Sequence, residues 1–285
     1  MNVDHYFTIG SSHQSQGTPC EDFALTGILQ EGFAYGVVAD GCSGANANTD
    51  IGARALACAF RRTVAQRIGG AGAWFSGTFH DQLLANFRNM RYDNEEVGDY
   101  LATVVGFVAT PEAASVYIHG DGAIAIRYAD GRLKLIELTW WDNTPYYLGY
   151  SLEQQEQDKF IRLYQNGFLE PFKQTITVWQ KTSDGLDVLE ASNERFILDQ
   201  VIDGHILHFH PREEGIVAMA VLTDGVGQLG QTPAIEVATE LLSFKNYEGS
   251  FVKRRMMRAL RLFHKAGIIP RDDIGMAAVW FPPEA

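Results

Sequence analysis

The segment at 35–50, Tyr-Gly-Val-Val-Ala-Asp-Gly-Cys-Ser-Gly-Ala-Asn-Ala-Asn-Thr-Asp, constrains the fold of this chain more than any other. An apolar run ends there at Asp40-Gly41, a loop of small residues follows, and a helical pattern begins near Thr49. A buried strand that ends in this way places a carboxylate and a backbone carbonyl at the edge of a sheet, where a hard cation can bind. Three further aspartate motifs follow along the chain: Gly-Asp-Gly at 120–122, Thr-Asp-Gly at 223–225 and Asp-Asp at 272–273.

The context of each Asp-Gly pair decides between a turn and a ligand, because this dipeptide is common in turns. Asp40 and Asp224 directly follow apolar runs, whereas the pairs at 130–131, 184–185 and 203–204 lie in polar surroundings and are predicted to be turns. Carboxylates that converge repel one another unless a cation compensates them. The acids therefore predict a binuclear site with ions about 3.5–4 Å apart, which is suited to in-line attack on a phosphoryl group.

The composition excludes several classes of protein. The chain has 285 residues, of which 46% are hydrophobic and 20% charged, and this is ample for a globular core. The net charge of −12 disfavours binding to nucleic acid. Three cysteines (Cys20, Cys42 and Cys58) without a Cys-x-x-Cys pair disfavour a disulfide framework or structural zinc. Without a long apolar run or a secretory leader, we expect a cytoplasmic protein that does not bind membranes.

The hydrophobic patterns predict an α+β chain. Strands are expected at 6–9, 22–28, 33–39, 101–109, 113–119, 122–129, 132–138, 216–222 and 275–281. Helices are expected at 49–68, 79–90, 151–165, 192–201 and 251–266, with another beginning after Thr232-Pro233. Short turns join most of the strands, so we expect two mainly antiparallel sheets stacked face to face with helices outside. A single domain over 1–285 is expected, because the first and last strands both carry motif acids that must meet.

Six short motifs in order resemble the metal-dependent protein phosphatases of type 2C, and the resemblance runs from about residue 8 to 281. The opening segment at 12–22 is similar to a bacterial subgroup of that family. The matching pieces are Pro19-Cys20-Glu21-Asp22, the segment at 38–44, Ala102-Thr103-Val104, Gly120-Asp121-Gly122, Leu222-Thr223-Asp224-Gly225 and Asp272-Asp273-Ile274.

The resemblance implies a four-layer αββα sandwich with two Mg²⁺ or Mn²⁺ ions between the sheets. In that family pattern Asp40 bridges the two metals, and the carbonyl of Gly41 binds one of them. Asp224 and Asp272 complete the other metal site. The resemblance thus makes Asp40 and Asp224 catalytic residues as well as ligands.

Four more positions carry roles implied by the same resemblance. Glu21 and Asp22 hold metal-bound waters, and Asp121 helps to bind a third, weaker metal. Thr103 supports the ligands and is counted with the catalytic residues. The nucleophile implied is a water activated by the binuclear centre, and the substrates implied are phosphoserine and phosphothreonine in proteins.

Three positions depart from the family pattern. Gly17 stands where many members have a phosphate-binding arginine, whose bidentate grip is not easily replaced; His13 and Arg54, beside the motif loops, are candidates to substitute for it. Cys42 stands where eukaryotic members have histidine, and a neutral thiol is a poor acid near pH 7. Gly275 stands where threonine or serine is usual. The metal ligands look intact, whereas the phosphate grip looks altered.

The leading hypothesis is a bacterial-type serine/threonine protein phosphatase that acts by direct attack of the activated water. One alternative is a catalytically weak or inactive relative that serves as a phosphoprotein-binding regulatory module. A second alternative is a metal hydrolase of a small phosphate ester. None of the three cysteines lies in a Cys-x5-Arg loop, which disfavours a cysteine phosphatase.

Two further features admit more than one interpretation. His208 and His210 lie at strand spacing near His205 and match either a zinc pair or, as we favour, exposed strand histidines. The helix at 251–266 carries a basic stripe in an acidic protein. This stripe is either a solvated outer face or a docking surface for an acidic partner.

Overall fold

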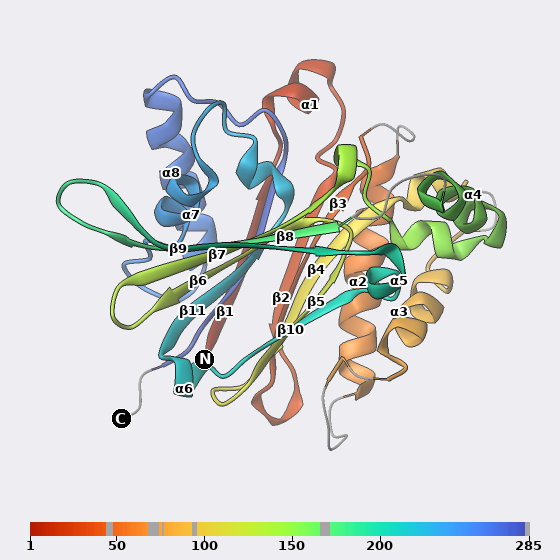
Figure 1. Cartoon of the computed structure of the whole chain (residues 1–285), viewed down its shortest axis with the longest axis horizontal. Helices are drawn as coiled ribbons and strands as arrows, with labels where there is room; N and C mark the ends of the chain where they lie inside the picture. The colour runs from red at the N-terminus through yellow and green to blue at the C-terminus, as the bar shows by residue number, and fades with distance from the viewer. Residues whose placement is uncertain (44–47, 68–73, 76, 93–95, 166–171, 283–285) are drawn as a thin grey trace.

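A computed structural model describes the chain at residues 1–43, 48–67, 74–75, 77–92, 96–165 and 172–282. These residues form two antiparallel sheets that stack face to face, with helices on both outer faces (Figure 1). The expected α+β sandwich of four αββα layers is confirmed. Within the described residues, no helix has the length and apolarity needed to cross a membrane.

The larger sheet has seven strands and joins the two ends of the chain. The order is β1 (Asn2–Thr8), β12 (Ile274–Trp280), β11 (Ile216–Leu222), β6 (Gly122–Tyr128), β7 (Arg132–Trp140), β8 (Phe172–Lys181) and β9 (Leu186–Phe196). Because β1 pairs with β12, Thr8 lies opposite Ile274. The segment that follows β1 therefore lies beside the Asp-Asp motif that precedes β12.

The smaller sheet has five strands in the order β10 (His205–Phe209), β5 (Ala114–His119), β4 (Ala102–Ala109), β3 (Ala34–Gly41) and β2 (Asp22–Ile28). Its register brings three residues together near the ends of adjacent strands. Asp22 lies opposite Asp40, and Asp40 lies opposite Thr103 on the next strand. Two motif acids and the motif threonine thus become neighbours through strand pairing alone.

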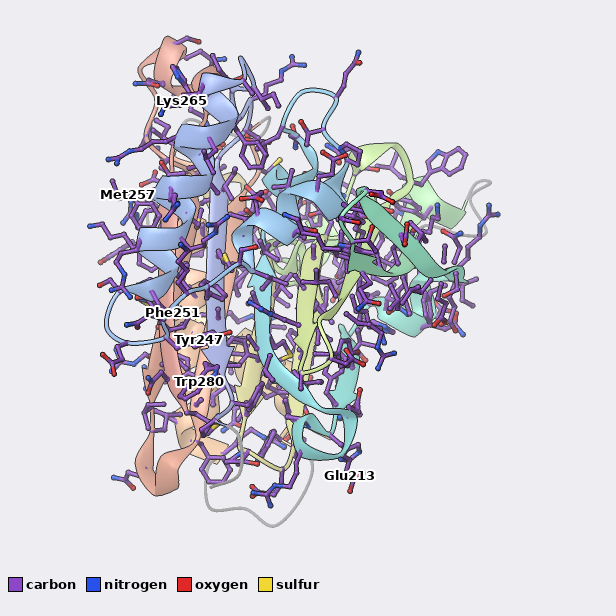
Figure 2. All side chains as sticks on the ribbon, turned by 90° about the vertical axis from the view of Figure 1, so that its left-hand side faces the viewer. Glu213, Tyr247, Phe251, Met257, Lys265 and Trp280 are labelled. Atoms are coloured by element: carbon purple, nitrogen blue, oxygen red, sulfur yellow. The ribbon has the colours of Figure 1, made fainter. Side chains whose placement is uncertain are left out.

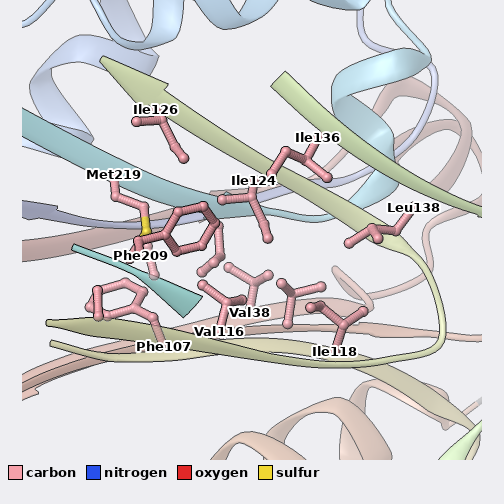
Figure 3. Close-up of a cluster of buried hydrophobic side chains, with 14 of the residues drawn as sticks. Val38, Phe107, Val116, Ile118, Ile124, Ile126, Ile136, Leu138, Phe209 and Met219 are labelled. Carbon is pink, nitrogen blue, oxygen red and sulfur yellow. The ribbon is translucent and has the colours of Figure 1, made fainter. Parts of the chain in front are cut away.

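Three buried apolar clusters correspond to the three interfaces between the layers. α2 (Thr49–Arg67) and α3 (Phe79–Arg88) pack on the outer face of the smaller sheet. α7 (Ala234–Leu241) and α8 (Phe251–Lys265) pack on the outer face of the larger one. The third cluster fills the space between the sheets (Figure 3). The remaining helices are α1 (Ser11–Gln16), α4 (Gln154–Gln165), α5 (Leu198–Val201) and α6 (Pro211–Glu214).

Burial on both faces explains why the inner strands read as continuous apolar runs. Every residue of β4 and β5 is buried, because one face of each strand meets the other sheet and the opposite face meets helices. Antiparallel strands that face water on one side alternate instead. These strands were therefore predictable from hydrophobicity, to within a few residues at their ends.

The prediction of a helix at 192–201 is wrong. Residues 192–196 belong to β9, which forms an unpredicted hairpin with β8, and only Leu198–Val201 are helical. All of β9 between its two end residues is exposed, so its sequence shows no alternation of apolar and polar residues. The short helix α1 was also unpredicted, because its six residues are too few to show a helical period.

Replacing Phe107 with alanine should destabilise the interface between the sheets. The side chain is fully buried in the cluster of Figure 3. We expect Phe107→Ala to lower the free energy of unfolding in urea by about 3–5 kcal/mol. Leu189→Ala, at a β9 side chain that is 54% exposed, should change it by less than about 0.5 kcal/mol. Equal effects of the two substitutions would contradict this account of the core.

Candidate metal centre

Four of the acids predicted as ligands line one cavity of about 250 Å³. Asp40 ends β3, Asp121 lies between β5 and β6, Asp224 follows β11, and Asp272 precedes β12. Gly41 and Thr103 line the same cavity. The two sheets thus bring together residues from five strand ends, as the order of the motifs led us to expect.

Glu21 and Asp22 are buried and do not line this cavity, although Asp22 lies opposite Asp40 in the smaller sheet. The Thr223 hydroxyl donates to Asp22 Oδ2 at 2.7 Å, and the Gly275 N–H donates to the same hydroxyl at 2.8 Å. Thr223 therefore links an acid of the smaller sheet to the backbone of the larger one. A β-carbon at Gly275 would lie 3.1 Å from Thr223 Cγ2, so the missing threonine or serine at 275 leaves room for Thr223.

The electrostatics of the cluster favour a bound cation. Burial raises the pKa of Asp22, Asp40, Asp121 and Asp272 above the usual value of 3.8, and the charges of neighbouring carboxylates raise it further. Asp22 Oδ1 and Asp224 Oδ1 are buried without a hydrogen-bond partner among the described residues. A set of carboxylates with free oxygens and a backbone carbonyl fits the ligand preference of Mg²⁺ or Mn²⁺.

Asp273, the second acid of the Asp-Asp motif, has a structural role. Asp273 is buried, and its two oxygens accept the N–H groups of Gly10 and Glu21, each at 2.6 Å. His13 Nδ1 lies 3.0 Å from Asp273 Oδ1, and His13 Nε2 lies 3.3 Å from Glu21 Oε2. Burial lowers the pKa of His13, but these carboxylates outweigh it and raise the pKa overall. His13, Asp272 and Asp273 together place three possible ligand atoms within 4.8 Å of one another.

The two candidates for phosphate binding lie outside the cavity lining. His13 is buried between Asp273 and Glu21. Arg54, on α2, lies 3.4 Å from Asp50 and 5.0 Å above the ring of Phe23. Among the described residues, no arginine, lysine or histidine lines the cavity. A role for His13 or Arg54 in phosphate binding stays a prediction.

The backbone at Gly17 explains part of this departure. Gly17 ends α1 in the left-handed conformation, with φ at +70° and open space around it. An arginine at this position would be strained, because side chains other than glycine adopt this conformation rarely. The turn that brings His13 to Asp273 therefore disfavours an arginine at the usual place.

Gln228 is a residue of the site that the sequence analysis missed. Its Nε2 donates to Asp224 Oδ2 at 3.0 Å and to Asp272 Oδ2 at 2.9 Å. One amide group thus supplies a donor to each of two like-charged carboxylates without adding charge. The sequence signal was weak, since Gln228 only follows Asp224 by four residues and its second partner lies 44 positions away.

Neutral polar groups and Pro145 form the rest of the cavity wall. Cys42 and Ser43 follow β3, and Asn143 and Tyr147 come from the segment after β7. They offer a thiol, two hydroxyls and an amide toward any group that enters. Cys42 and Ser43 belong to the motif at 38–44, whereas Asn143 and Tyr147 carried no motif by which the sequence alone could have identified them.

The histidines near β10 have ordinary partners. His208 Nδ1 lies 2.8 Å from Ser115 Oγ, and His205 Nε2 lies 3.1 Å from Gln174 Oε1. His210 is exposed just after the strand. In the part of the chain that the structure describes, these histidines belong to no group of three possible metal ligands. This favours exposed strand histidines over a zinc pair.

Comparisons with known proteins agree with this architecture. The family model for protein phosphatase 2C matches residues 9–262. Among solved structures, a bacterial serine phosphatase is similar with a TM-score of 0.54 and 11% identity, covering 100% of this chain and 99% of that one. A serine/threonine phosphatase from Staphylococcus aureus has a TM-score of 0.51 and 12% identity, covering 99% and 96%.

A third similar structure has a different biological description. A sex-determining protein of C. elegans has a TM-score of 0.54 and 13% identity, covering 99% of this chain and 65% of that one. No curated protein sequence matches the chain. At these identities the structures establish the fold alone.

Asp40→Asn should stabilise the protein when divalent metal is removed. The raised pKa of Asp40 means that its contribution to stability is present below about pH 3.8 and is lost as the pH rises through the raised value. In EDTA, the advantage of Asp40→Asn should therefore grow with pH, by about 1.4 kcal/mol per pH unit until the raised pKa is reached. Unfolding in urea at pH 5 and pH 8 measures it.

The control for this experiment is Asp187→Asn, at an exposed acid of β9, which should stay within about 0.5 kcal/mol of wild type at both pH values. Saturating Mn²⁺ should reverse the order, because it stabilises only the protein that binds it. Wild-type protein that is more stable than Asp40→Asn in EDTA at pH 8 would contradict the repulsion described above.

Gln228→Ala should weaken metal binding. Losing both amide donors leaves Asp224 and Asp272 free to move apart, and outer partners of metal ligands contribute about 10- to 100-fold in affinity. Calorimetric titration with Mn²⁺ measures the loss. Gln16→Ala, at an exposed position of α1, is the matched control. An unchanged affinity in Gln228→Ala would show that the amide does not position these acids.

Proposed function

This chain belongs to the protein phosphatase 2C family, and on that premise we propose that it is a metal-dependent phosphatase of phosphoserine and phosphothreonine in proteins. The observation that carries the proposal is the convergence of Asp40, Asp121, Asp224 and Asp272 on one cavity. The raised pKa values of Asp40, Asp121 and Asp272 and the unpartnered oxygen of Asp224 give that cavity the properties of a cation site.

In the proposed site, two Mg²⁺ or Mn²⁺ ions would supply Lewis acids and lower the pKa of the water that attacks phosphorus in line. Asp40 would contribute to both metal positions, the Gly41 carbonyl would contribute to one of them, and Asp224 and Asp272 would complete the other. Asp121 would contribute to a third, weaker position.

Residues next to the four cavity acids would set the orientation of the ligands. Asp22 would act through its free oxygen, while its other oxygen is held by Thr223. Glu21 would be oriented by His13. Thr103, opposite Asp40 in the sheet, would support that carboxylate from the neighbouring strand.

Phosphate binding in the proposed site depends on neutral hydrogen-bond donors. Since the described lining of the cavity contains no cationic side chain, the negative charge of a phosphoryl group would be balanced by metal. Ser43, Asn143 and Tyr147 would then orient the phosphoryl oxygens by hydrogen bonds. This arrangement accounts for a working site without the usual arginine.

The absence of a cationic side chain from the described cavity lining also supports a second candidate function. Without a cationic grip, the chain would serve as a phosphoprotein-binding regulatory module that keeps the metal site but turns over slowly or not at all. A metal hydrolase of a small phosphate ester is a third candidate, and substrate preference separates it from the first. In each case we propose one domain over residues 1–285 and a cytoplasmic location.

The decisive assay is hydrolysis of p-nitrophenyl phosphate and a phosphothreonine peptide, with and without Mn²⁺. Wild type is compared with Asp40→Asn and Asp224→Asn, and Asp187→Asn is the control. We expect metal-dependent turnover of the peptide that falls by about 100-fold or more in both ligand variants, equivalent to roughly 2.7 kcal/mol of transition-state stabilisation.

Two outcomes would redirect the proposal. Wild-type protein that binds Mn²⁺ calorimetrically but turns over neither substrate would support the regulatory module. Faster hydrolysis of free nucleotides than of the phosphopeptide would support the small-ester hydrolase.

A further inference from the structure

Helix α8 has a charge pattern opposite to that of the chain as a whole. The chain has a net charge of −12, yet Phe251–Lys265 contains no acidic residue. Its six cationic residues are Lys253, Arg254, Arg255, Arg258, Arg261 and Lys265. Such a local concentration of one sign marks a surface that attracts the opposite charge.

The folding of α8 is explained without most of these charges. The side chains of Phe251, Val252 and Phe263 are buried against the larger sheet and α7. The carboxylate of Asp4 accepts the N–H groups of Val252 and Lys253 at 2.6 and 3.2 Å, so it caps the helix N-terminus. Arg255 has a clear structural role, since its side chain is nearly buried and pairs with Glu240.

Four of the other cations share one face, which we call the α8 stripe: Arg254, Arg258, Arg261 and Lys265. They are spaced by four, three and four residues, so they are neighbours on the helix surface. Like charges at this spacing disfavour a helix. The stripe therefore works against the stability of α8 and calls for another explanation.

The stripe is also uncompensated. Arg254 donates to the backbone carbonyl of Glu248 at 2.7 Å. Within the described residues, no carboxylate forms an ion pair with Arg258, Arg261 or Lys265. Some exposed cations elsewhere do have such partners: Arg132 pairs with Asp130, and Lys159 pairs with Glu156.

A recess of about 220 Å³ lies at one end of the stripe, between α8 and the segment that follows α7. Phe244 and Phe251 line it together with Lys245, Arg254 and Arg258. Both phenylalanines are buried, whereas Lys245, Arg254 and Arg258 are exposed. An apolar floor with several cations at its rim suits the carboxylate of an acidic side chain, which guanidinium groups bind in a bidentate way.

Apolar side chains accompany the stripe. Met257 is 37% exposed and Leu262 is 47% exposed, and α8 lies at the surface of the molecule (Figure 2). These side chains offer contact area to the apolar residues of a polypeptide, which a purely ionic surface would lack.

We propose that the α8 stripe and its recess bind a short acidic segment of a partner protein, with one acidic side chain in the recess. Charge complementarity selects an acidic ligand, and Met257 and Leu262 select a polypeptide. A helix of 15 residues spans about 22 Å. A longer polyanion would extend beyond the helix and be repelled by the acidic remainder of the protein. A short ligand avoids this repulsion, because salt screens charges that lie more than about 8 Å away at physiological ionic strength.

This proposal does not depend on the phosphatase activity and is tested without it. A fluorescein-labelled twelve-residue peptide of alternating Glu and Leu is titrated with protein in EDTA, and binding is followed by fluorescence anisotropy. The double variant Arg258→Glu/Arg261→Glu should lower the affinity by about 10-fold or more. The control Arg62→Glu, at an exposed cation of α2, should stay within about twofold of wild type.

Two further arms make the result specific. The milder variant Arg258→Gln/Arg261→Gln should give an intermediate loss, and it serves as the test where the double Glu variant fails to fold by circular dichroism. A peptide in which glutamine replaces every Glu should not bind, and raising the salt should weaken binding of the acidic peptide.

Three results would overturn the proposal. The first is equal affinity of wild type and both double variants for the acidic peptide. The second is equal binding of the glutamine peptide. The third is tighter binding to phosphatidylserine vesicles or double-stranded DNA than to the peptide, which would identify α8 as a membrane or nucleic-acid surface.

Discussion

Repulsion between buried carboxylates is the constraint on which the rest of this structure depends. Acids from both sheets converge on one cavity, and burial together with the charge of neighbouring carboxylates raises the pKa values of Asp40, Asp121 and Asp272, and of the nearby Asp22. The chain opposes this repulsion with donors that carry no charge. The hydroxyl of Thr223 bonds Asp22, and the amide of Gln228 bonds Asp224 and Asp272. Such donors keep the carboxylates in place and leave their negative charge uncompensated, which is the condition under which a divalent cation binds tightly.

Asp273 holds the part of the framework that carries these acids. It accepts one N–H from Gly10, after the first strand, and another from Glu21, before the second. Both donors lie more than 250 positions from Asp273 in the chain, so a single buried carboxylate joins segments that meet only in the folded state. His13 lies against the same carboxylate and against Glu21. The geometry around Glu21 is therefore tied to the start of β12, next to Asp272.

The sequence predicted the parts of the molecule in which one local signal dominates. The inner strands were recognisable because burial on both faces makes them continuously apolar. Asp40 and Asp224 stood out because each lies at or just after the end of such a strand. β9 escaped prediction because it is exposed on both faces, and α1 because six residues show too little periodicity. The contacts of Gln228 depend on how two distant acids converge, so no local pattern could reveal them. Binding of metal by these acids stays a prediction.

The proposed site also implies a dependence of substrate binding on metal. Where an arginine grips phosphate, part of the affinity is independent of metal, because the guanidinium carries its own charge. Here Gly17 ends α1 in a conformation that disfavours arginine, and the cavity lining described above has no cation of its own. Neutral donors such as Asn143 and Tyr147 orient a phosphoryl group but do not balance its charge. In such a site the affinities for phosphate and for metal must be strongly coupled, and by linkage each ligand raises the affinity for the other by the same factor.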